Sequence, residues 1–81
     1  MDDLLSTTQM AWVLGQSSGR VRRMIRDGEI EATRIPGGFR IAKAEALRLA
    51  RERIEAEADR KVSDRDLEKL IDQVLATNEQ P

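Results

Sequence analysis

The stretch from Gly15 to Gly28 most constrains the fold, because it carries signals for both ends of one short helix. Ser17 is a favourable N-cap, since its hydroxyl can accept a hydrogen bond from a free amide in the first turn. Gly28 is a favourable stop, because the residue just after a helix often takes a left-handed backbone that glycine tolerates. The apolar residues between them share one face at helical spacing, namely Val21, Met24 and Ile25. The stretch therefore predicts a helix that buries a narrow apolar stripe.

The rest of this helix surface is rich in arginine. At about 100° per residue, the side opposite the apolar stripe carries Gly19, Arg22, Arg23 and Arg26, with Arg20 on its flank. Arginine presents a planar fork of donors that matches phosphate oxygens and the guanine edge. The helix N-terminus adds a partial positive charge. This face predicts contact with a nucleic acid, and an ordinary solvated helix surface is the alternative.

Length and composition restrict the classes of function. The 81 residues suffice for one small domain. The chain has no cysteine, which excludes disulfides and thiolate chemistry and predicts a reducing, cytoplasmic setting. It has no histidine, the usual metal ligand and general base, so we expect no catalytic residues, no metal and no cofactor. No apolar run approaches the ~20 residues of a membrane span, and the polar start does not resemble a signal peptide.

The charge is unevenly distributed, although the formal net charge is only −1. Residues 17–40 contain six arginines and three acids, whereas residues 51–81 contain six basic and nine acidic residues. The near-neutral net charge is therefore the sum of a basic first half and an acidic second half. The basic charge of the first half is compatible with nucleic-acid binding.

A second short helix is expected from Thr7 to Leu14, after loose residues 1–3. Ser6 and Gln9 have the spacing of a capping box, and Leu5 with Met10 has that of a hydrophobic staple. Met10, Ala11 and Leu14 form its inward stripe. Trp12 lies about 200° from Met10. We expect Trp12 to pack beneath a later segment, with an exposed contact for DNA or a partner as the alternative.

A two-stranded hairpin is expected after the arginine-rich helix. Its strands are residues 30–35 and 39–41, and Pro36-Gly37-Gly38 supplies strong turn chemistry between them. Arg34 and Arg40 flank the turn. The helix at residues 7–14, a tight turn at Gly15-Gln16 and the arginine-rich helix together form a helix-turn-helix. A hairpin that follows it and carries an arginine on either side of its turn is typical of a wing that touches the DNA backbone or minor groove. Alternatively, the hairpin only covers the core and its arginines are solvated.

The second half of the chain favours helix. Residues 42–61 contain no glycine or proline and have an apolar stripe at Leu47, Ala50, Ile54 and Ala58. Ala46 and Leu49 lie elsewhere on this helix and can close the core under the wing. Ser63 is the expected N-cap of a last helix, before a frayed end at residues 76–81. The stripe of this helix consists of Leu67, Leu70, Ile71, Val74 and Leu75. It can fold back on residues 7–14 or mediate contacts between molecules. We favour self-association slightly, because the charged segment 59–61 can act as a hinge that lets the last helix swing away. We accordingly divide the chain into a DNA-binding domain, residues 1–50, and a helical extension for oligomerisation or partner binding, residues 51–81.

The first half resembles the excisionase branch of the MerR-type winged helix-turn-helix proteins. The resemblance covers about residues 4–50 and is carried by Leu4-Leu5-Ser6, Ala11, Leu14-Gly15, Ser17, Val21-Arg22-Arg23-Met24-Ile25, Gly28-Glu29-Ile30, Arg34-Ile35 and Phe39-Arg40-Ile41. The expected fold is therefore mainly α with a small β-hairpin, a winged helix-turn-helix followed by C-terminal helices.

The resemblance implies DNA binding with the second helix in the major groove and the hairpin at the adjacent groove. It places Ser18, Gly19, Arg20 and Arg23 at base-facing positions, Arg22 and Arg26 at phosphate positions, and Arg34, Gly37, Gly38 and Arg40 in the wing. Gly19 departs from the pattern, because many relatives carry a longer polar or basic side chain there.

An excisionase, or recombination directionality factor, performs no catalysis. It binds adjacent sites, bends the DNA and helps the integrase of a phage or plasmid to run excision. The expected partners are thus double-stranded DNA, further copies of this chain and an integrase, without a membrane. A small transcriptional regulator of the same fold and a DNA-binding terminase small subunit are the alternatives, because fold analogy does not fix a biological role.

Overall fold

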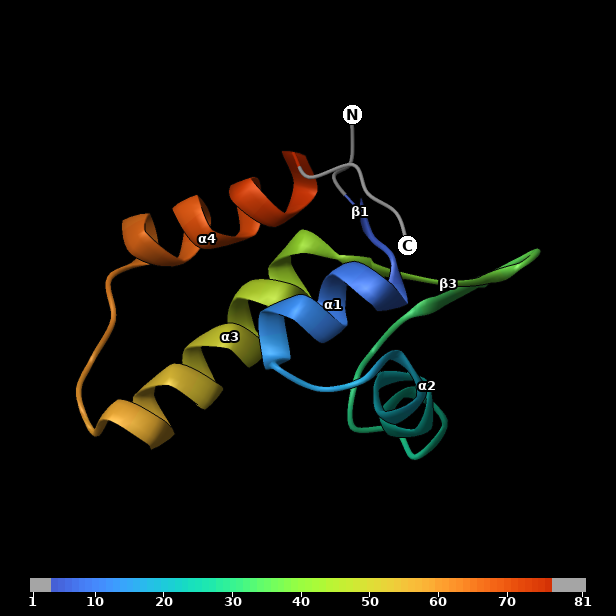
Figure 1. Cartoon of the computed structure of the whole chain (residues 1–81), viewed down its shortest axis with the longest axis horizontal. Helices are drawn as coiled ribbons and strands as arrows, with labels where there is room; N and C mark the ends of the chain where they lie inside the picture. The colour runs from blue at the N-terminus through green and yellow to red at the C-terminus, as the bar shows by residue number, and fades with distance from the viewer. Residues whose placement is uncertain (1–3, 77–81) are drawn as a thin grey trace.

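The computed structural model describes residues 4–76, so the expectations for residues 1–3 and 77–81 lie outside the described part. The elements in chain order are β1 (Leu4–Leu5), α1 (Thr7–Leu14), α2 (Ser18–Arg26), β2 (Thr33–Ile35), β3 (Gly38–Ala42), α3 (Lys43–Ala58) and α4 (Asp64–Ala76). The expected fold class is confirmed, since four helices combine with a small antiparallel sheet at one side of the molecule in an arrangement compatible with a winged helix (Figure 1).

Helices α1 and α2 begin and end as their local signals predict. The Gln9 amide donates to Ser6 Oγ at 3.1 Å and the Ser6 amide donates to Gln9 Oε1 at 2.9 Å, which completes the capping box. Gly15 ends α1 in the left-handed conformation, with φ of 68°. The Arg20 amide donates to Ser17 Oγ at 3.1 Å, so Ser17 is the N-cap of α2.

The sheet has one strand more than expected. Its order is β1-β3-β2, and Leu5 pairs with Ile41 across β1 and β3. Both side chains are fully buried. The hydrophobic staple at Leu5 therefore also extends the hairpin into a three-stranded sheet, because the backbone of residues 4–5 reaches the free edge of β3.

The hairpin strands differ in length from the expectation. Strand β2 begins at Thr33 rather than residue 30, because the amides of Glu29 and Ile30 donate to the carbonyl of Met24 and so complete the end of α2. Ile30 is instead a core residue, 2% exposed. Strand β3 already begins at Gly38, which leaves Pro36-Gly37 as the turn. Proline followed by a glycine at φ of 91° matches a type II turn.

Helix α3 is shorter than predicted, and Ala46 and Leu49, which were expected to close the core under the wing, are buried more fully than most of the predicted stripe. It ends at Ala58, and Asp59 follows in the left-handed conformation with φ of 54°. Its fully packed residues are Ala46, Leu49 and Ala50, with Leu47 and Ile54 partly buried. The expected burial of Ala58 is wrong, because the last three residues of α3, Ala56, Glu57 and Ala58, are all exposed.

Helix α4 folds back on its own chain. It lies across α3 and α1 (Figure 1), and Leu67 and Ile71 are 1% and 0% exposed. Leu70, Val74 and Leu75 pack partly buried against the same core. The preference for self-association is therefore wrong for Leu67 and Ile71, which are covered within the monomer. The boundary expected at residue 50 lies inside α3, and core residues come from both sides of it.

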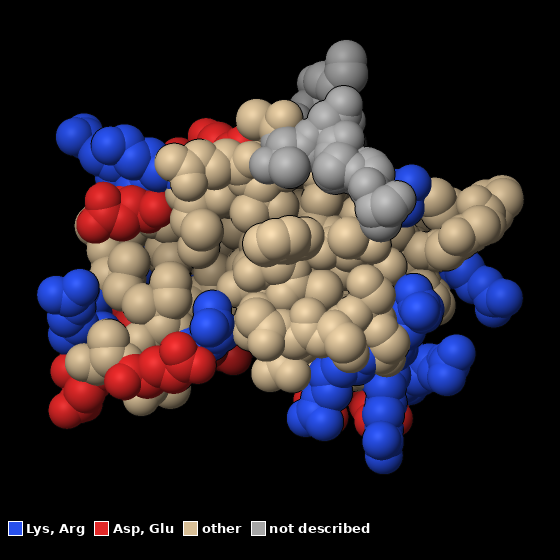
Figure 2. Space-filling model, in the orientation of Figure 1, with Lys and Arg blue, Asp and Glu red and all other residues tan. Residues whose placement is uncertain are grey.

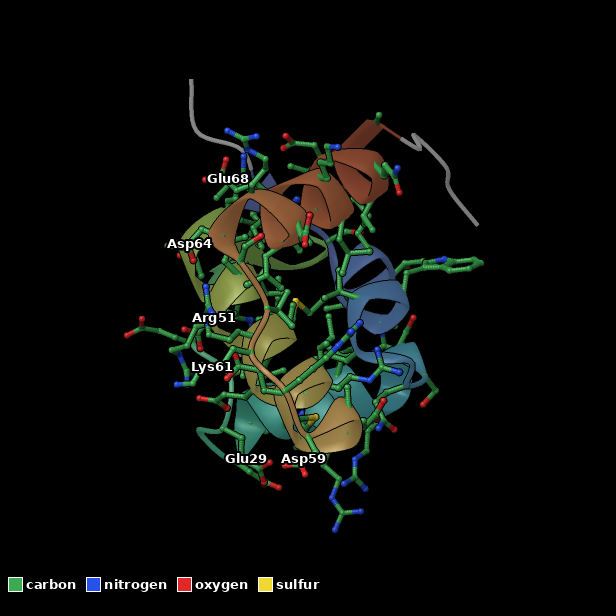
Figure 3. All side chains as sticks on the ribbon, turned by 90° about the vertical axis from the view of Figure 1, so that its left-hand side faces the viewer. Glu29, Arg51, Asp59, Lys61, Asp64 and Glu68 are labelled. Carbon is green, nitrogen blue, oxygen red and sulfur yellow. The ribbon has the colours of Figure 1, made fainter. Side chains whose placement is uncertain are left out.

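The segment between α3 and α4 is held by side chains of α3. The Glu55 carboxylate accepts the amide of Val62 at 3.1 Å, and Arg51 donates to the Val62 carbonyl at 2.6 Å. Arg51 also pairs with Glu55 and with Asp64 at the start of α4 (Figure 3). The Val62 amide, together with Arg51, lowers the pKa of Glu55. These contacts fix the course of a segment that the sequence suggested as a hinge.

Candidate nucleic-acid interface

Helix α2 sits on α1 with a thin apolar side. Val21 is fully buried, while Met24 and Ile25 are partly buried against the core. Thr8 Oγ1 of α1 and Ser18 Oγ of α2 are 3.5 Å apart at the junction of the two helices. The other positions predicted to face DNA from α2 are exposed: Gly19, Arg20, Arg22, Arg23 and Arg26.

Most of the predicted arginines have no internal counter-charge. Across residues 4–76, no ion pair involves Arg20, Arg22, Arg26 or Arg34. Arg23 Nε lies 4.0 Å from Asp27, and both side chains are more than half exposed. An exposed pair at this distance contributes little. The basic side chains project on the side of α2 and the hairpin, whereas the side of the α3 end carries mixed charges (Figure 2).

A hollow separates the end of α2 from the hairpin. It has a volume of about 700 Å³ and is open to solvent. Its described lining contains no acidic residue and consists of Arg26, Arg34, Ile35, Pro36, Gly37, Gly38 and Phe39. Arg34 and Phe39 are direct cross-strand partners, so their side chains share one face of the hairpin. The fold thus brings together Arg26 and Arg34, which the sequence placed in separate elements.

The second wing arginine points the other way. Arg40 follows Phe39 in β3, and successive side chains of a strand point to opposite faces. It is partly buried, and its guanidinium donates to the carbonyl of Phe39 at 2.8 Å. Arg34 and Arg40 therefore do not lie on one surface, although both flank the turn at Gly37.

An acid of α3 anchors the connection between α2 and β2. Glu45 Oε2 accepts the amide of Glu31 at 2.9 Å and pairs with Arg48 at 2.8 Å. The bond to Arg48 lowers the pKa of Glu45, and the Glu31 amide adds to this effect. The i,i+3 spacing of Glu45 and Arg48 could have indicated a helix-surface pair. No sequence signal pointed to the bond with Glu31, because it joins residues of different elements.

Trp12 is 76% exposed, so the expectation that a later segment covers it is wrong. The buried residues of α1 are Met10, Ala11, Val13 and Leu14. At about 100° per residue these four span little less than half of the helix circumference, and Trp12 lies opposite the middle of that arc. Val13, which was not predicted for the core, is 2% exposed and belongs to it.

Comparisons of the chain with models of protein families, with curated proteins and with solved structures gave no match. Within residues 4–76, no cluster of three or more acidic side chains is suited to hold a metal ion. No helix there is long and apolar enough to cross a membrane. The candidate site is therefore defined by its own geometry and charge.

Proposed function

We propose that this chain binds double-stranded DNA, with α2 in the major groove and the β2–β3 hairpin against the adjacent backbone. The observation that carries the proposal is the set of exposed arginines without internal partners on α2 and the hairpin. Leaving such charges unpaired costs little in water, and it keeps their donors available for phosphates and base edges.

The geometry supports different tasks for these arginines. Arg23 lies near the middle of the exposed side of α2, where a helix in the major groove meets base edges. Arg22 lies towards one border of that side, where a phosphate would pass. Arg26 and Arg34 border the same hollow, so one strand of the DNA backbone between α2 and the hairpin would be contacted from both elements.

Within DNA binding, the resemblance of residues 4–50 favours an architectural excision factor. Such a protein binds adjacent sites, bends the DNA and assists an integrase. The fold-back of α4 means that copies along DNA would meet through surfaces other than Leu67 and Ile71. A transcriptional regulator of the same fold and a terminase small subunit use the same interface, so the biological role is decided by the DNA that is bound.

A gel-shift titration tests the proposal, with DNA from around the gene and from the neighbouring attachment site, at several salt concentrations. Binding that weakens steeply with salt is expected, because phosphate contacts release counterions. A ladder of complexes with bent DNA supports the excision factor. A single complex near the promoter supports the regulator. Salt-insensitive binding or no binding would contradict a DNA-binding function.

A further inference from the structure

Gly19 is the one of the five glycines whose backbone conformation does not require a glycine. Gly15, Gly28, Gly37 and Gly38 all have positive φ, a backbone conformation that other residues rarely adopt. Gly19 lies in the first turn of α2 with an ordinary helical backbone. Glycine in a helix is less stable than alanine, because it loses more backbone freedom on folding.

The packing of the monomer does not require a glycine at this position either. A Cβ atom built on Gly19 would meet only Ser17 Oγ, at 3.9 Å, an ordinary van der Waals contact. By contrast, a Cβ atom on Gly15 would lie 2.9 Å from the guanidinium of Arg53. The free protein therefore has room for a side chain at Gly19 and would gain stability from one.

Gly19 lies in the middle of the arginine-rich side of α2. Arg22 and Arg23 follow it at i+3 and i+4, so they are its neighbours on the helix surface. Their long side chains can spread sideways, whereas the backbone at Gly19 is bare. The exposed side of α2 thus has no side chain at this point of its first turn, one helical turn before Arg22 and Arg23.

We propose that Gly19 is a clearance position, at which the base edges of the major groove come into van der Waals contact with the backbone of α2. This inference rests on the proposed DNA binding and deepens it. A methyl group at position 19 would hold the first turn away from the groove and lengthen the reach required of Arg23. Gly19 would then contribute to DNA affinity because it has no side chain.

The experiment measures thermal stability and DNA affinity for Gly19→Ala and Gly19→Leu in the full chain. We expect a higher melting temperature for Gly19→Ala, together with DNA binding that is about tenfold weaker. Binding should be weaker still for Gly19→Leu, because the larger side chain holds the helix further away. A stabilised protein that binds less well is not explained by damage to the fold.

Asp59→Gly provides the matched control. Asp59 has positive φ directly after α3, and the C-terminal end of α3 lies apart from α2 (Figure 1), so glycine there should also raise the melting temperature. Its DNA affinity should equal that of the wild type. If Gly19→Ala binds DNA as well as the wild type does, the clearance role is overturned while DNA binding stands. If the wild-type protein itself shows no salt-sensitive binding, both proposals fail.

Discussion

Two groups of arginines, one on α3 and the other on α2 and β2, have opposite surroundings. On α3, Arg48 pairs with Glu45 and Glu52, Arg51 with Glu55, and Arg53 with Glu57. On α2 and β2, most of the arginines have no acid within reach in the described residues. The residue type is the same, and what differs is whether the same helix carries an acid three or four positions away. The arginines of α3 are paired within the molecule, whereas most of those of α2 remain available to an external polyanion.

The largest expected effect concerns the α3–α4 side. Ile71→Ala removes a fully buried side chain between α4 and the core, so it should lower the free energy of unfolding by about 2–5 kcal/mol. Denaturant titration measures this loss. Glu68→Ala on the exposed side of α4 is the control and should change stability by less than about 0.5 kcal/mol. A small effect of Ile71→Ala would show that α4 does not belong to the core of its own chain.

The second effect concerns the α2 side and should leave stability unchanged. Arg23→Ala should weaken binding to a cognate site by about 1–3 kcal/mol and reduce discrimination against other sequences. Arg22→Ala should weaken binding to all DNA alike and reduce the salt dependence by about one phosphate contact. Titrations on cognate and random duplexes separate the two variants. An equal loss on both duplexes for Arg23→Ala would contradict a base-reading role.

A third, smaller effect is the response of the two anchored acids to pH. The pKa values of Glu45 and Glu55 are lowered in the folded protein, because they accept backbone amides and pair with Arg48 and Arg51. A lowered folded-state pKa adds stability above the unfolded value near 4.5, and this stability is lost as the pH falls through the folded-state pKa. Glu45→Gln should therefore be less stable than wild type at neutral pH, and the difference should shrink in acid. A constant difference between pH 7 and pH 3 would contradict this.

The smallest effect is expected for Trp12, which belongs to neither arginine group. Because its side chain is 76% exposed, Trp12→Ala should change the free energy of unfolding by less than about 0.5 kcal/mol. The fluorescence of the wild-type protein, which has one tryptophan, should resemble that of tryptophan in water and be quenched readily by iodide. A blue-shifted, protected emission would mean that Trp12 is covered in solution.

Local features of the fold could be read from the sequence. The ends of α1 and α2 follow from Ser6, Gly15, Ser17 and Gly28, because caps and stops depend on hydrogen bonds within one turn of helix. The arginine-rich side of α2 follows from helical periodicity alone. These signals involve residues at most a few positions apart, and the three-dimensional surroundings do not override them.

Tertiary structure decided which surfaces meet. The sequence pattern of the apolar stripe of α4 is equally compatible with packing on a partner molecule and with packing on the core of its own chain. The structure shows the second, because α4 packs on α1 and α3 and Ile71 is buried there. The same holds for β1 beside β3, for Arg26 beside Arg34 across the hollow, and for the exposure of Trp12. Hydrophobic burial is non-directional, so an apolar stripe predicts that a helix face is covered but does not predict which element covers it.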